Sequence, residues 1–468
     1  MSSPPQSEVT RSGQPELKRV MGPGLLLLFV VGDILGTGVY ALTGKVAAEV
    51  GGAVWLPFLT AFLVAILTAF SYLELVTKYP RAAGAALYTH KAFGIQFLTF
   101  MVTFTVMCSG LTSASSASEA FASNFVEAFD LSVGDGVALT LLALSFITVV
   151  GLVNFRGVSE SVRVNVVLTI VELAGLLIII LIGAWALTRG AGDTSRLLDF
   201  DTADGQSPFG AVTAATALAF FAMVGFEDSV NMAEETKDPV RIFPKVMLFG
   251  LCLTGLIYVL VSISSVALVS PEELGEGDAP LLKVVAAGAP DFPVGLFAFI
   301  TMFAVANSAL INMLMASRLL YGMAQERVVP RFLGSVHATR RTPWAGIVFT
   351  TLVAFGLIFF ADLTALGGTT SLLLLCVFTI VNVAVLVLRR DPVDHKHFHA
   401  PTALPVIGAV ACAYLASPFS GRAGADYRVA AVLMVIGVVL WAVTYGVQHY
   451  VLHEDVDPDP ERMSSAAP

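Results

Sequence analysis

The chain has 468 residues, of which 56% are hydrophobic and only 13% are charged, whereas soluble proteins carry roughly 25% charged residues. A long soluble domain could not cover its surface with so few polar groups, so the composition excludes one. The formal net charge of −9 comes from loops and tails and gives no indication of nucleic-acid binding.

The apolar residues are gathered in runs that meet or approach the ~20 residues needed to cross the core of a bilayer. We therefore expect an all-α integral membrane protein of about twelve transmembrane helices, the ninth and eleventh being short. The transmembrane domain is expected over residues 21–452, between a tail at 1–20 and an acidic tail at 453–468. The runs are 22–43, 53–77, 94–127, 137–155, 161–188, 208–232, 245–269, 293–324, 344–361, 364–388, 402–418 and 429–451.

Basic residues predict the orientation of these helices. Lys and Arg accumulate in cytoplasmic loops. If the N-terminus is cytoplasmic, most of the 26 Lys and Arg lie on the cytoplasmic side. The exceptions are Lys45, Arg189, Arg196, Lys283, Arg422 and Arg428. Both termini are therefore predicted to be cytoplasmic. The first apolar run continues to full spanning length, so no cleavable signal is expected.

The first predicted span contains the sequence GDILGTG at residues 32–38. Glycine costs a helix about 1 kcal/mol relative to alanine, and an aspartate at membrane depth costs at least ~2.5 kcal/mol. Close packing through small residues would explain Gly32 and Gly36, but not Asp33. Unwound backbone survives in a membrane only where it faces protein or a wet cavity. We therefore expect the first helix to be broken beside a cavity.

The sixth predicted span is interrupted in the same way, by the sequence FFAMVGFED at residues 220–228. Spans one and six occupy matching positions if helices 1–5 and 6–10 form two halves of the chain. Interrupted helices at matching positions are the best sequence indication of a transporter's binding site. A channel would need a continuous polar stripe, and an enzyme would need a nucleophile–base or metal-binding set. The pattern favours a carrier over both.

The inner loop after the tenth span holds His395, His397 and His399 in a tight cluster. A metal site is one interpretation, and a solvated loop is the one that its position favours. No phosphate-binding Gly-Lys-Ser/Thr motif occurs in the sequence. No metal or cofactor is therefore expected.

Four segments resemble those of amino acid permeases of the amino acid–polyamine–organocation (APC) superfamily. They are GDILGTGVYALTG in the first span, YPRAAGAALYTHKAFG at 79–94, GFEDSVNMAEETKDPVRIFPKV at 225–246 and ASRLLYGMAQERVVPRFL at 316–333. The similarity runs from about residue 20 to 450 and is greatest to bacterial permeases related to cationic amino acid transporters. It implies a LeuT-type inverted repeat of five plus five helices, with helices 1 and 6 broken at the midplane and helices 11 and 12 added. It also implies alternating access around a site between helices 1, 3, 6 and 8.

The break in the first helix would complement both ends of an amino acid zwitterion. Backbone amides at the start of the second half-helix present partial positive charge to a carboxylate, here those of Gly36, Thr37 and Gly38, and the Thr37 hydroxyl can add a donor. The ammonium would meet carbonyl groups at the two breaks, at Asp33, Ile34, Phe220, Phe221 and Met223, with Gly225 at the second break. Phe221 resembles the aromatic residue that closes over the substrate in the family, although most phenylalanines are ordinary packing residues.

Asp33 departs from the small residue that is usual in this motif. It would favour a cationic side chain or an amine, titrate during transport, or cap the second half-helix. Valine at Gly36 or Gly38 would crowd the substrate carboxylate and disfavour the positive φ that glycine tolerates. Such variants are predicted to insert normally and to lose transport.

Several further polar residues are candidates for gating or coupling. Glu227 stands where family members carry an acidic residue that links the site to the inner gate, and a carboxylate bonded to nearby amides is the alternative. In helix 8, Asn307, Ser308 and Asn312 would line the coupling region or form interhelical hydrogen bonds.

Glu172 in helix 5 lies in a stretch where several proton-coupled family members carry a lysine. An isolated ionised carboxylate in a bilayer is costly, so burial favours the neutral acid. This group would load and release a proton, pair with a cation, or bond to helix 1 or 8.

These features together predict a secondary active transporter for an amino acid or related amine in a bacterial plasma membrane, and not an enzyme. An amino acid/polyamine exchanger and a transporter-like sensor are the alternatives. The expected partners are a small-molecule substrate and the lipid bilayer, with protons as a further candidate and no nucleic acid. The sequence leaves the oligomeric state open.

Overall fold

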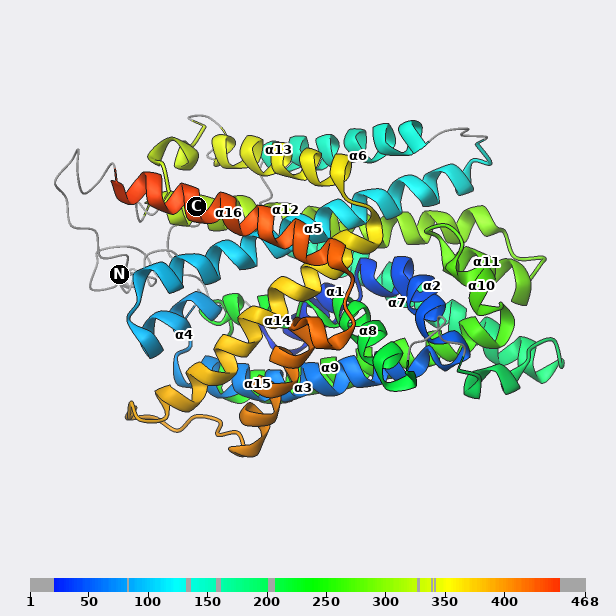
Figure 1. The fold of residues 1–468 in the computed structure, drawn as a ribbon, viewed down its shortest axis with the longest axis horizontal. Coiled ribbons are helices and arrows are strands. Elements are labelled where there is room, and N and C mark those ends of the chain that lie inside the picture. Colours follow the sequence, from blue (N-terminus) through cyan, green and yellow to red (C-terminus); the bar gives the residue numbers. More distant parts are fainter. Residues whose placement is uncertain are drawn as a thin grey trace, which may run out of the picture.

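The computed structural model describes residues 21–81, 84–131, 136–156, 161–200, 207–325, 329–337, 340 and 342–446. The predicted tails, 1–20 and 453–468, lie outside these ranges, as does the end of the predicted transmembrane domain at 447–452. Within the described ranges every regular element is a helix, apart from one isolated bridge between Met21 and Thr236. Most long helices run along the longest axis of the molecule (Figure 1).

The first half of the chain begins with two short helices, and most of the helices that follow are longer. Its helices are α1 (Pro23–Ile34), α2 (Thr37–Val50), α3 (Trp55–Lys78), α4 (Gly84–Phe93), α5 (Gln96–Ala128), α6 (Gly136–Arg156) and α7 (Ser161–Thr188). Short 3₁₀ turns follow α2 and α7, namely η1 (Gly51–Ala53) and η2 (Thr194–Leu198).

The second half repeats the short, interrupted start. Its elements are α8 (Pro208–Ala219), η3 (Phe220–Met223), η4 (Asp228–Met232), α9 (Pro239–Leu268), α10 (Pro271–Gly275), α11 (Pro280–Gly288), α12 (Val294–Gln325), η5 (Arg331–Gly334), α13 (Trp344–Phe360) and α14 (Leu363–Leu388). The chain continues through α15 (Ala403–Ala416), η6 (Pro418–Ser420) and α16 (Gly424–Gly446).

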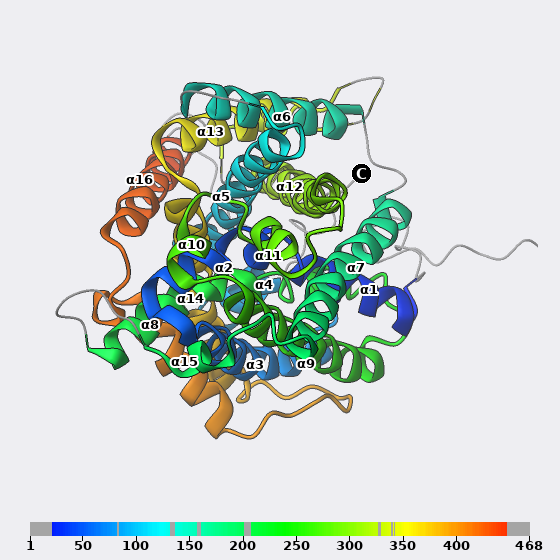
Figure 2. The same ribbon diagram turned by 90° about the vertical axis from the view of Figure 1, so that its right-hand side faces the viewer.

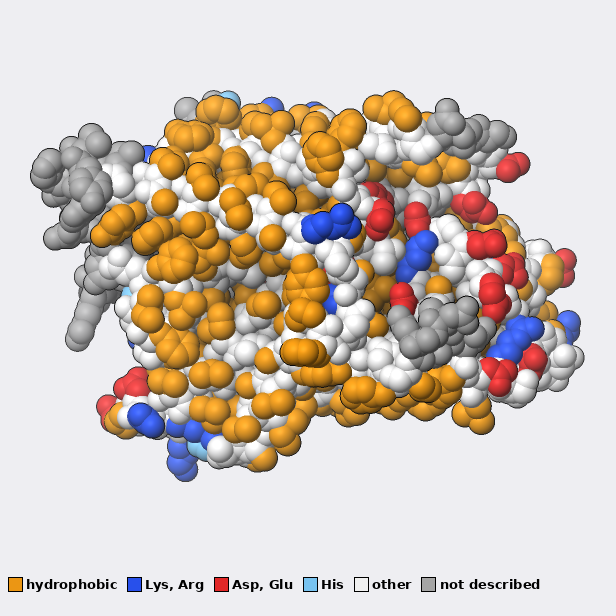
Figure 3. All heavy atoms as spheres, in the orientation of Figure 1, with side chains coloured by type: hydrophobic (Ala, Val, Ile, Leu, Met, Phe, Trp, Pro, Cys, Tyr) orange, Lys and Arg blue, Asp and Glu red, His pale blue; other side chains and the backbone are white. Residues whose placement is uncertain are grey.

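Ten helical segments in the described ranges are long and apolar enough to cross a membrane. Two shorter apolar helices, α13 with 17 residues and α15 with 14, occupy the ninth and eleventh predicted runs. The surface agrees, because hydrophobic side chains cover most of the face in Figure 3, and charged groups gather mainly toward the ends of the long axis. The protein is a multi-pass membrane protein, while the count of twelve spans stays a prediction.

Buried hydrophobic side chains form two clusters. One is built largely from α2, α3, α9 and α14, and the other largely from α5 and α12. Seen along the long axis, α5, α6, α12 and α13 lie on one side and α3, α9 and α15 on the opposite side, with α2 between them (Figure 2). Phe220 belongs to the first cluster and Phe221 to the second, so the interruption after α8 lies at their boundary.

Candidate functional site

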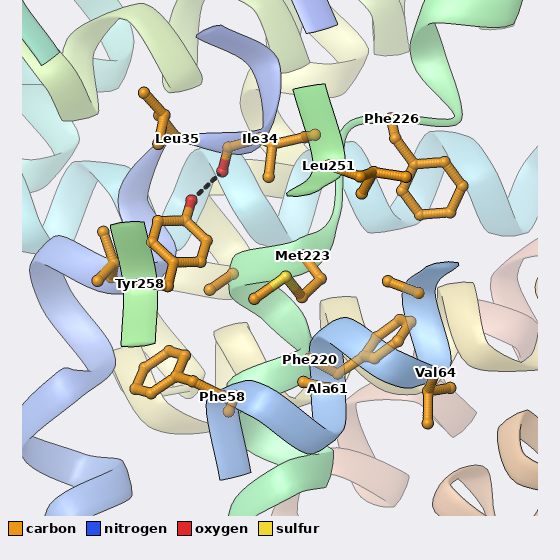
Figure 4. Close-up of a cluster of buried hydrophobic side chains, with 14 of the residues drawn as sticks. Ile34, Leu35, Phe58, Ala61, Val64, Phe220, Met223, Phe226, Leu251 and Tyr258 are labelled. Carbon is orange, nitrogen blue, oxygen red and sulfur yellow. Dashed lines mark hydrogen bonds between the residues drawn. The ribbon is translucent and has the colours of Figure 1, made fainter. Parts of the chain in front are cut away.

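The first helix is interrupted where the glycine pattern predicts it. Helix α1 ends at Ile34 and α2 begins at Thr37. The Tyr258 hydroxyl of α9 donates a hydrogen bond to the Ile34 carbonyl, which α1 itself leaves free (Figure 4). Gly36, the N-cap residue of α2, has no side chain that could cap the helix. Its first amide groups are therefore open to another acceptor.

The sixth predicted span is also interrupted, and its second part differs from the expected half-helix. After η3 the chain is extended at Val224 and turns at Gly225, whose φ of 125° favours glycine. The Gly225 amide donates to Glu227 Oε2 at 2.9 Å, which holds this turn. The chain then continues as 3₁₀ turns through η4 and re-enters an α-helix only at Pro239. The break is therefore longer than the sequence indicates.

The two breaks touch each other through main-chain atoms. A Cβ atom at Gly225 would lie 2.6 Å from the Asp33 carbonyl oxygen, and one at Gly38 would lie 2.4 Å from the Cα of Ala222. Both glycines are thus required for close approach of the backbones. The positive φ expected in the first break is absent there, since Gly36 has a φ of −52° and the positive value belongs to Gly225.

A small cavity lies where the breaks meet. It measures about 20 Å³, which is room for about one water molecule. Its walls come from α1, α2, α5, the second break and α12. The lining residues are Asp33, Ile34, Gly36, Thr37, Gly38, Ser113, Phe221, Val224, Gly225, Asp228, Ser308 and Asn312. Most of the predicted substrate-binding residues are therefore neighbours in space.

Two predicted residues point their side chains elsewhere. Phe220 and Met223 are fully buried in the first hydrophobic cluster, near Phe58 and Ala61 of α3 (Figure 4). Only their backbone groups remain candidates for contact with a substrate.

A second cavity of about 20 Å³ lies next to the first. The two share Val224, Asp228 and Asn312 as lining residues. The second cavity also contacts Glu227 and extends along α12 to Leu319, toward the end of that helix at Gln325. These three shared residues therefore form a partition between the two spaces.

Glu172 is fully buried beside α12. Its Oε1 accepts a hydrogen bond from Asn307 Nδ2 at 3.4 Å, and its backbone carbonyl accepts one from the Tyr40 hydroxyl at 2.6 Å. Its Oε2 has no hydrogen-bond partner among the described residues. Helix α12 is the eighth predicted span, so the predicted bond from Glu172 to helix 8 is present. One carboxyl oxygen of Glu172 remains for a further partner.

Comparison of the sequence with known proteins places the chain in a family. The sequence pattern of the family described as "Amino acid permease" matches residues 26–443. The chain belongs to this family. It is a transporter family within the APC superfamily, so the protein is a permease and not an enzyme.

Several relatives resemble this permease over most of its length. It is 26% identical to the branched-chain amino acid permease BcaP of Bacillus subtilis (strain 168), over 86% of this chain and 87% of the relative. The methylthioribose transporter of the same organism is also 26% identical, over 86% and 88%. The vacuolar cationic amino acid transporter 4 of Arabidopsis thaliana is 27% identical, over 82% of this chain and 66% of the relative.

The permease concentrates acidic groups at the breaks. Glu172 and Glu227 are buried, and Asp33 and Asp228 are half-buried. None of the four forms an ion pair with a Lys, Arg or His among the described residues. Within those residues, Asp33 Oδ2 and the Thr37 hydroxyl also lack a hydrogen-bond partner. Asp33 does not cap α2, so the capping alternative is excluded in this structure.

Sequence reasoning missed Ser113, Val224 and Asp228 as lining residues of the permease cavity. Asp228 stands beside Glu227, and the acidic pair was a visible signal for it. Ser113 lies in a serine-rich stretch of α5, residues 113–118, whose small polar side chains are unusual in an apolar span. Val224 carries no such signal, because its place depends on the turn at Gly225.

Proposed function

We propose that this permease is a secondary active transporter that carries an amino acid or related amine across the plasma membrane by alternating access. The observation that supports it most strongly is the cavity at the meeting point of the two helix breaks. Uncapped amides form one wall, and carboxylates without a basic partner in the described part of the chain form another. The relatives' names point the same way, since they include a branched-chain amino acid permease and a cationic amino acid transporter.

The substrate carboxylate is proposed to bind at the start of α2. The amides of Gly36, Thr37 and Gly38 have no side-chain cap, and the amino end of a helix attracts anions. The α-ammonium of the substrate is proposed to lie toward Asp228, and an amine on the substrate side chain toward Asp33, so that both would compensate carboxylates that have no basic partner among the described residues.

The remaining walls would set the shape of the substrate side chain. Ser113 of α5 and Ser308 and Asn312 of α12 provide polar contacts, and Phe221 provides an aromatic one. Phe221 is buried between the cavity and the second hydrophobic cluster. It is proposed to move as the site opens, because a cavity for one water cannot admit an amino acid.

The helix packing supports the proposed five-plus-five repeat with two added helices. Helix α3 packs extensively on α9, and α5 packs extensively on α12. These pairs join the second and third spans of the first half to the second and third spans of the second half. Elements related by an internal two-fold axis meet in this way near the axis. On this arrangement α13 and α15 complete twelve spans, with both termini cytoplasmic.

Alternating access would use the boundary between the two hydrophobic clusters. On the outer side the loop that holds α10 and α11 packs on α2, where Lys45 pairs with Asp278 at 3.1 Å and bonds to the Gly275 carbonyl. On the inner side Val224, Asp228 and Asn312 separate the site from the second cavity. Separation of the α10–α11 loop from α2 would open the site outward. Separation of Val224, Asp228 and Asn312 would open it inward.

Glu172 is the proposed coupling group. It lies on α7, buried against α12 and close to the first break, and it has one carboxyl oxygen without a partner among the described residues. Burial without a cation favours the protonated acid, and exposure to water on one side would release the proton. This proposal makes the permease a proton symporter.

Transport by the purified protein in proteoliposomes tests the proposal. A thermal-shift screen against amino acids and polyamines first selects a ligand, because a bound ligand raises the melting temperature. Uptake of that ligand into empty vesicles under an inward proton gradient supports symport. Uptake only into vesicles preloaded with an amino acid or polyamine would identify an exchanger. Binding without uptake in either case would contradict transport and favour a sensor.

A further inference from the structure

A large groove lies on the membrane-facing side of the permease, away from the proposed substrate site. It has a volume of about 470 Å³ and is lined by α13, the start of α14 and α16. Volumes of this size are typical of binding sites for small molecules. The helices on either side expose apolar side chains, such as Leu352 at 60%, Phe360 at 90% and Val432 at 61%. In a multi-pass membrane protein such a surface faces lipid.

The groove is polar at one end and apolar along the rest. Asp362 is the N-cap of α14, two residues after the end of α13, and Arg428 lies in the second turn of α16. From this end the lining reaches back to Val353 on α13 and forward to Ile436 on α16. At 1.5 Å per residue the apolar part is roughly 12 Å long. Hydrophobic side chains predominate over these two helices, with basic and acidic groups near the start of α16 (Figure 3).

The charges at the polar end are balanced. The neighbouring pair Arg422 and Asp426 is buried and bonded to itself at 3.0 Å, so it offers little net charge to a ligand. The exposed residues Arg428 and Asp362 then present one cation and one anion to the groove. Asp362 also accepts a hydrogen bond from the Ala365 amide as the N-cap of α14.

We propose that this groove binds a zwitterionic phospholipid that carries a primary ammonium, as phosphatidylethanolamine does. The phosphate lies at Arg428, the ammonium at Asp362, and one acyl chain along the apolar part. An anionic lipid would satisfy Arg428 but place its extra negative charge near Asp362. A headgroup with one charge of each sign complements both residues.

Native mass spectrometry of the full-length protein in detergent tests this directly. Phosphatidylethanolamine and phosphatidylglycerol with identical acyl chains are titrated separately, and the fraction of lipid-bound protein is measured. The wild type is expected to retain phosphatidylethanolamine at lower lipid concentration than phosphatidylglycerol. Arg428→Gln should weaken binding of both lipids about tenfold, because a charge-assisted hydrogen bond is lost.

Two further variants separate the headgroup from the groove. Asp362→Asn keeps an N-cap residue for α14 but removes the charge, so it should weaken only phosphatidylethanolamine binding. Gly356→Leu fills the groove, since no heavy atom lies within 4 Å of a Cβ at Gly356. It should reduce binding of both lipids. Gly136→Leu at the start of α6 is the matched control, because its Cβ also meets nothing within 4 Å and lies outside the groove.

Equal or tighter binding of phosphatidylglycerol by the wild type would overturn the proposal. So would lipid binding by Gly356→Leu that matches the Gly136→Leu control. A Gly356→Leu protein that changes from dimer to monomer in the same spectra would show that a second copy covers the groove, which also overturns it. The shift in melting temperature caused by each lipid is recorded for every variant, so that a loss of folding is recognised separately.

Discussion

Every N–H donor of the buried Arg422 guanidinium has an acceptor. By contrast, the carboxylates at the helix breaks have no partner of opposite charge among the described residues. Arg422 pairs with Asp426 and donates to the Leu415, Gly368 and Ala217 carbonyls and to the Ser371 hydroxyl. An arginine has five N–H donors, and these bonds use all of them. At the breaks Asp33 and Glu172 each keep an oxygen without a partner in the described structure.

We propose that this difference separates charges that hold the fold from charges that bind a ligand. Ala217 lies in the last turn of α8, so Arg422 anchors the half-helix that leads to Phe221. Glu74 works similarly at the other end of α14, where it bonds to Arg389 at 2.7 Å and to the Ala400 amide. The hydrogen bonds that Arg389 donates to Glu74 raise the pKa of Arg389, which stays charged. Structural charges in this permease are paired by the protein itself.

Removal of the paired cation is expected to have the largest effect. Arg422→Gln leaves Asp426 buried without its partner, and loss of one member of a buried ion pair costs about 3–5 kcal/mol. We expect a clear fall in the melting temperature of the purified protein. The double variant Arg422→Met, Asp426→Leu should recover part of the loss, since it leaves no lone charge. A single variant that melts with the wild type would remove the contrast between the two regions.

Two glycines of the first break should separate folding from transport. A Cβ at Gly38 meets the Ala222 backbone, which cannot move aside, so Gly38→Val should destabilise the protein by about 1–3 kcal/mol. A Cβ at Gly36 meets only the Ser308 side chain at close range, its Oγ at 2.9 Å and its Cβ at 3.1 Å, and a shift of this side chain by a few tenths of an ångström relieves both contacts. Gly36→Val should therefore keep its melting temperature and lose uptake in proteoliposomes. Normal uptake by Gly36→Val would show that the break serves packing alone.

Neutralising Asp33 should change selectivity more than stability. Its oxygen has no partner among the described residues, and a charge-assisted bond to an ammonium is worth roughly tenfold in affinity. We expect Asp33→Asn to bind lysine or a diamine about tenfold more weakly relative to alanine. Competition against uptake of a labelled substrate measures this ratio, with Asp228→Asn tested beside it. An unchanged ratio in both variants would mean that neither carboxylate meets a cationic side chain of the ligand.

The smallest expected effect on stability is that of Glu172→Gln. Glutamine is close in shape to the neutral acid and retains an acceptor for Asn307, so the free energy of unfolding should change by less than about 1 kcal/mol. Uptake should nevertheless lose its response to an imposed proton gradient. Uptake is compared between pH 5 and pH 8 in wild type and variant, with and without that gradient. Identical profiles would exclude Glu172 as the coupling group.

The sequence was sufficient to place both breaks and most of the cavity, because glycines and acidic residues are costly inside apolar spans and therefore conspicuous. It did not reveal that the second break continues as 3₁₀ turns, since that depends on the positive φ of Gly225 and its bond to Glu227. It also did not distinguish Phe220 from Phe221, adjacent residues that belong to different hydrophobic clusters. The neighbours of a side chain, which come from distant spans, decide such details.

The backbone contact between the two breaks bears on how this carrier evolves. Gly225 and Gly38 set the frame of the cavity through main-chain atoms, while Ser113, Ser308 and Asn312 line it from α5 and α12. On the proposed binding site, exchanges at the lining positions are expected to alter the substrate and leave the backbone contact in place. Relatives at 26–27% identity are indeed named for branched-chain amino acids, methylthioribose and cationic amino acids. If the cavity is the substrate site as proposed, a fixed backbone contact with exchangeable lining side chains would let related carriers change substrate by a few substitutions.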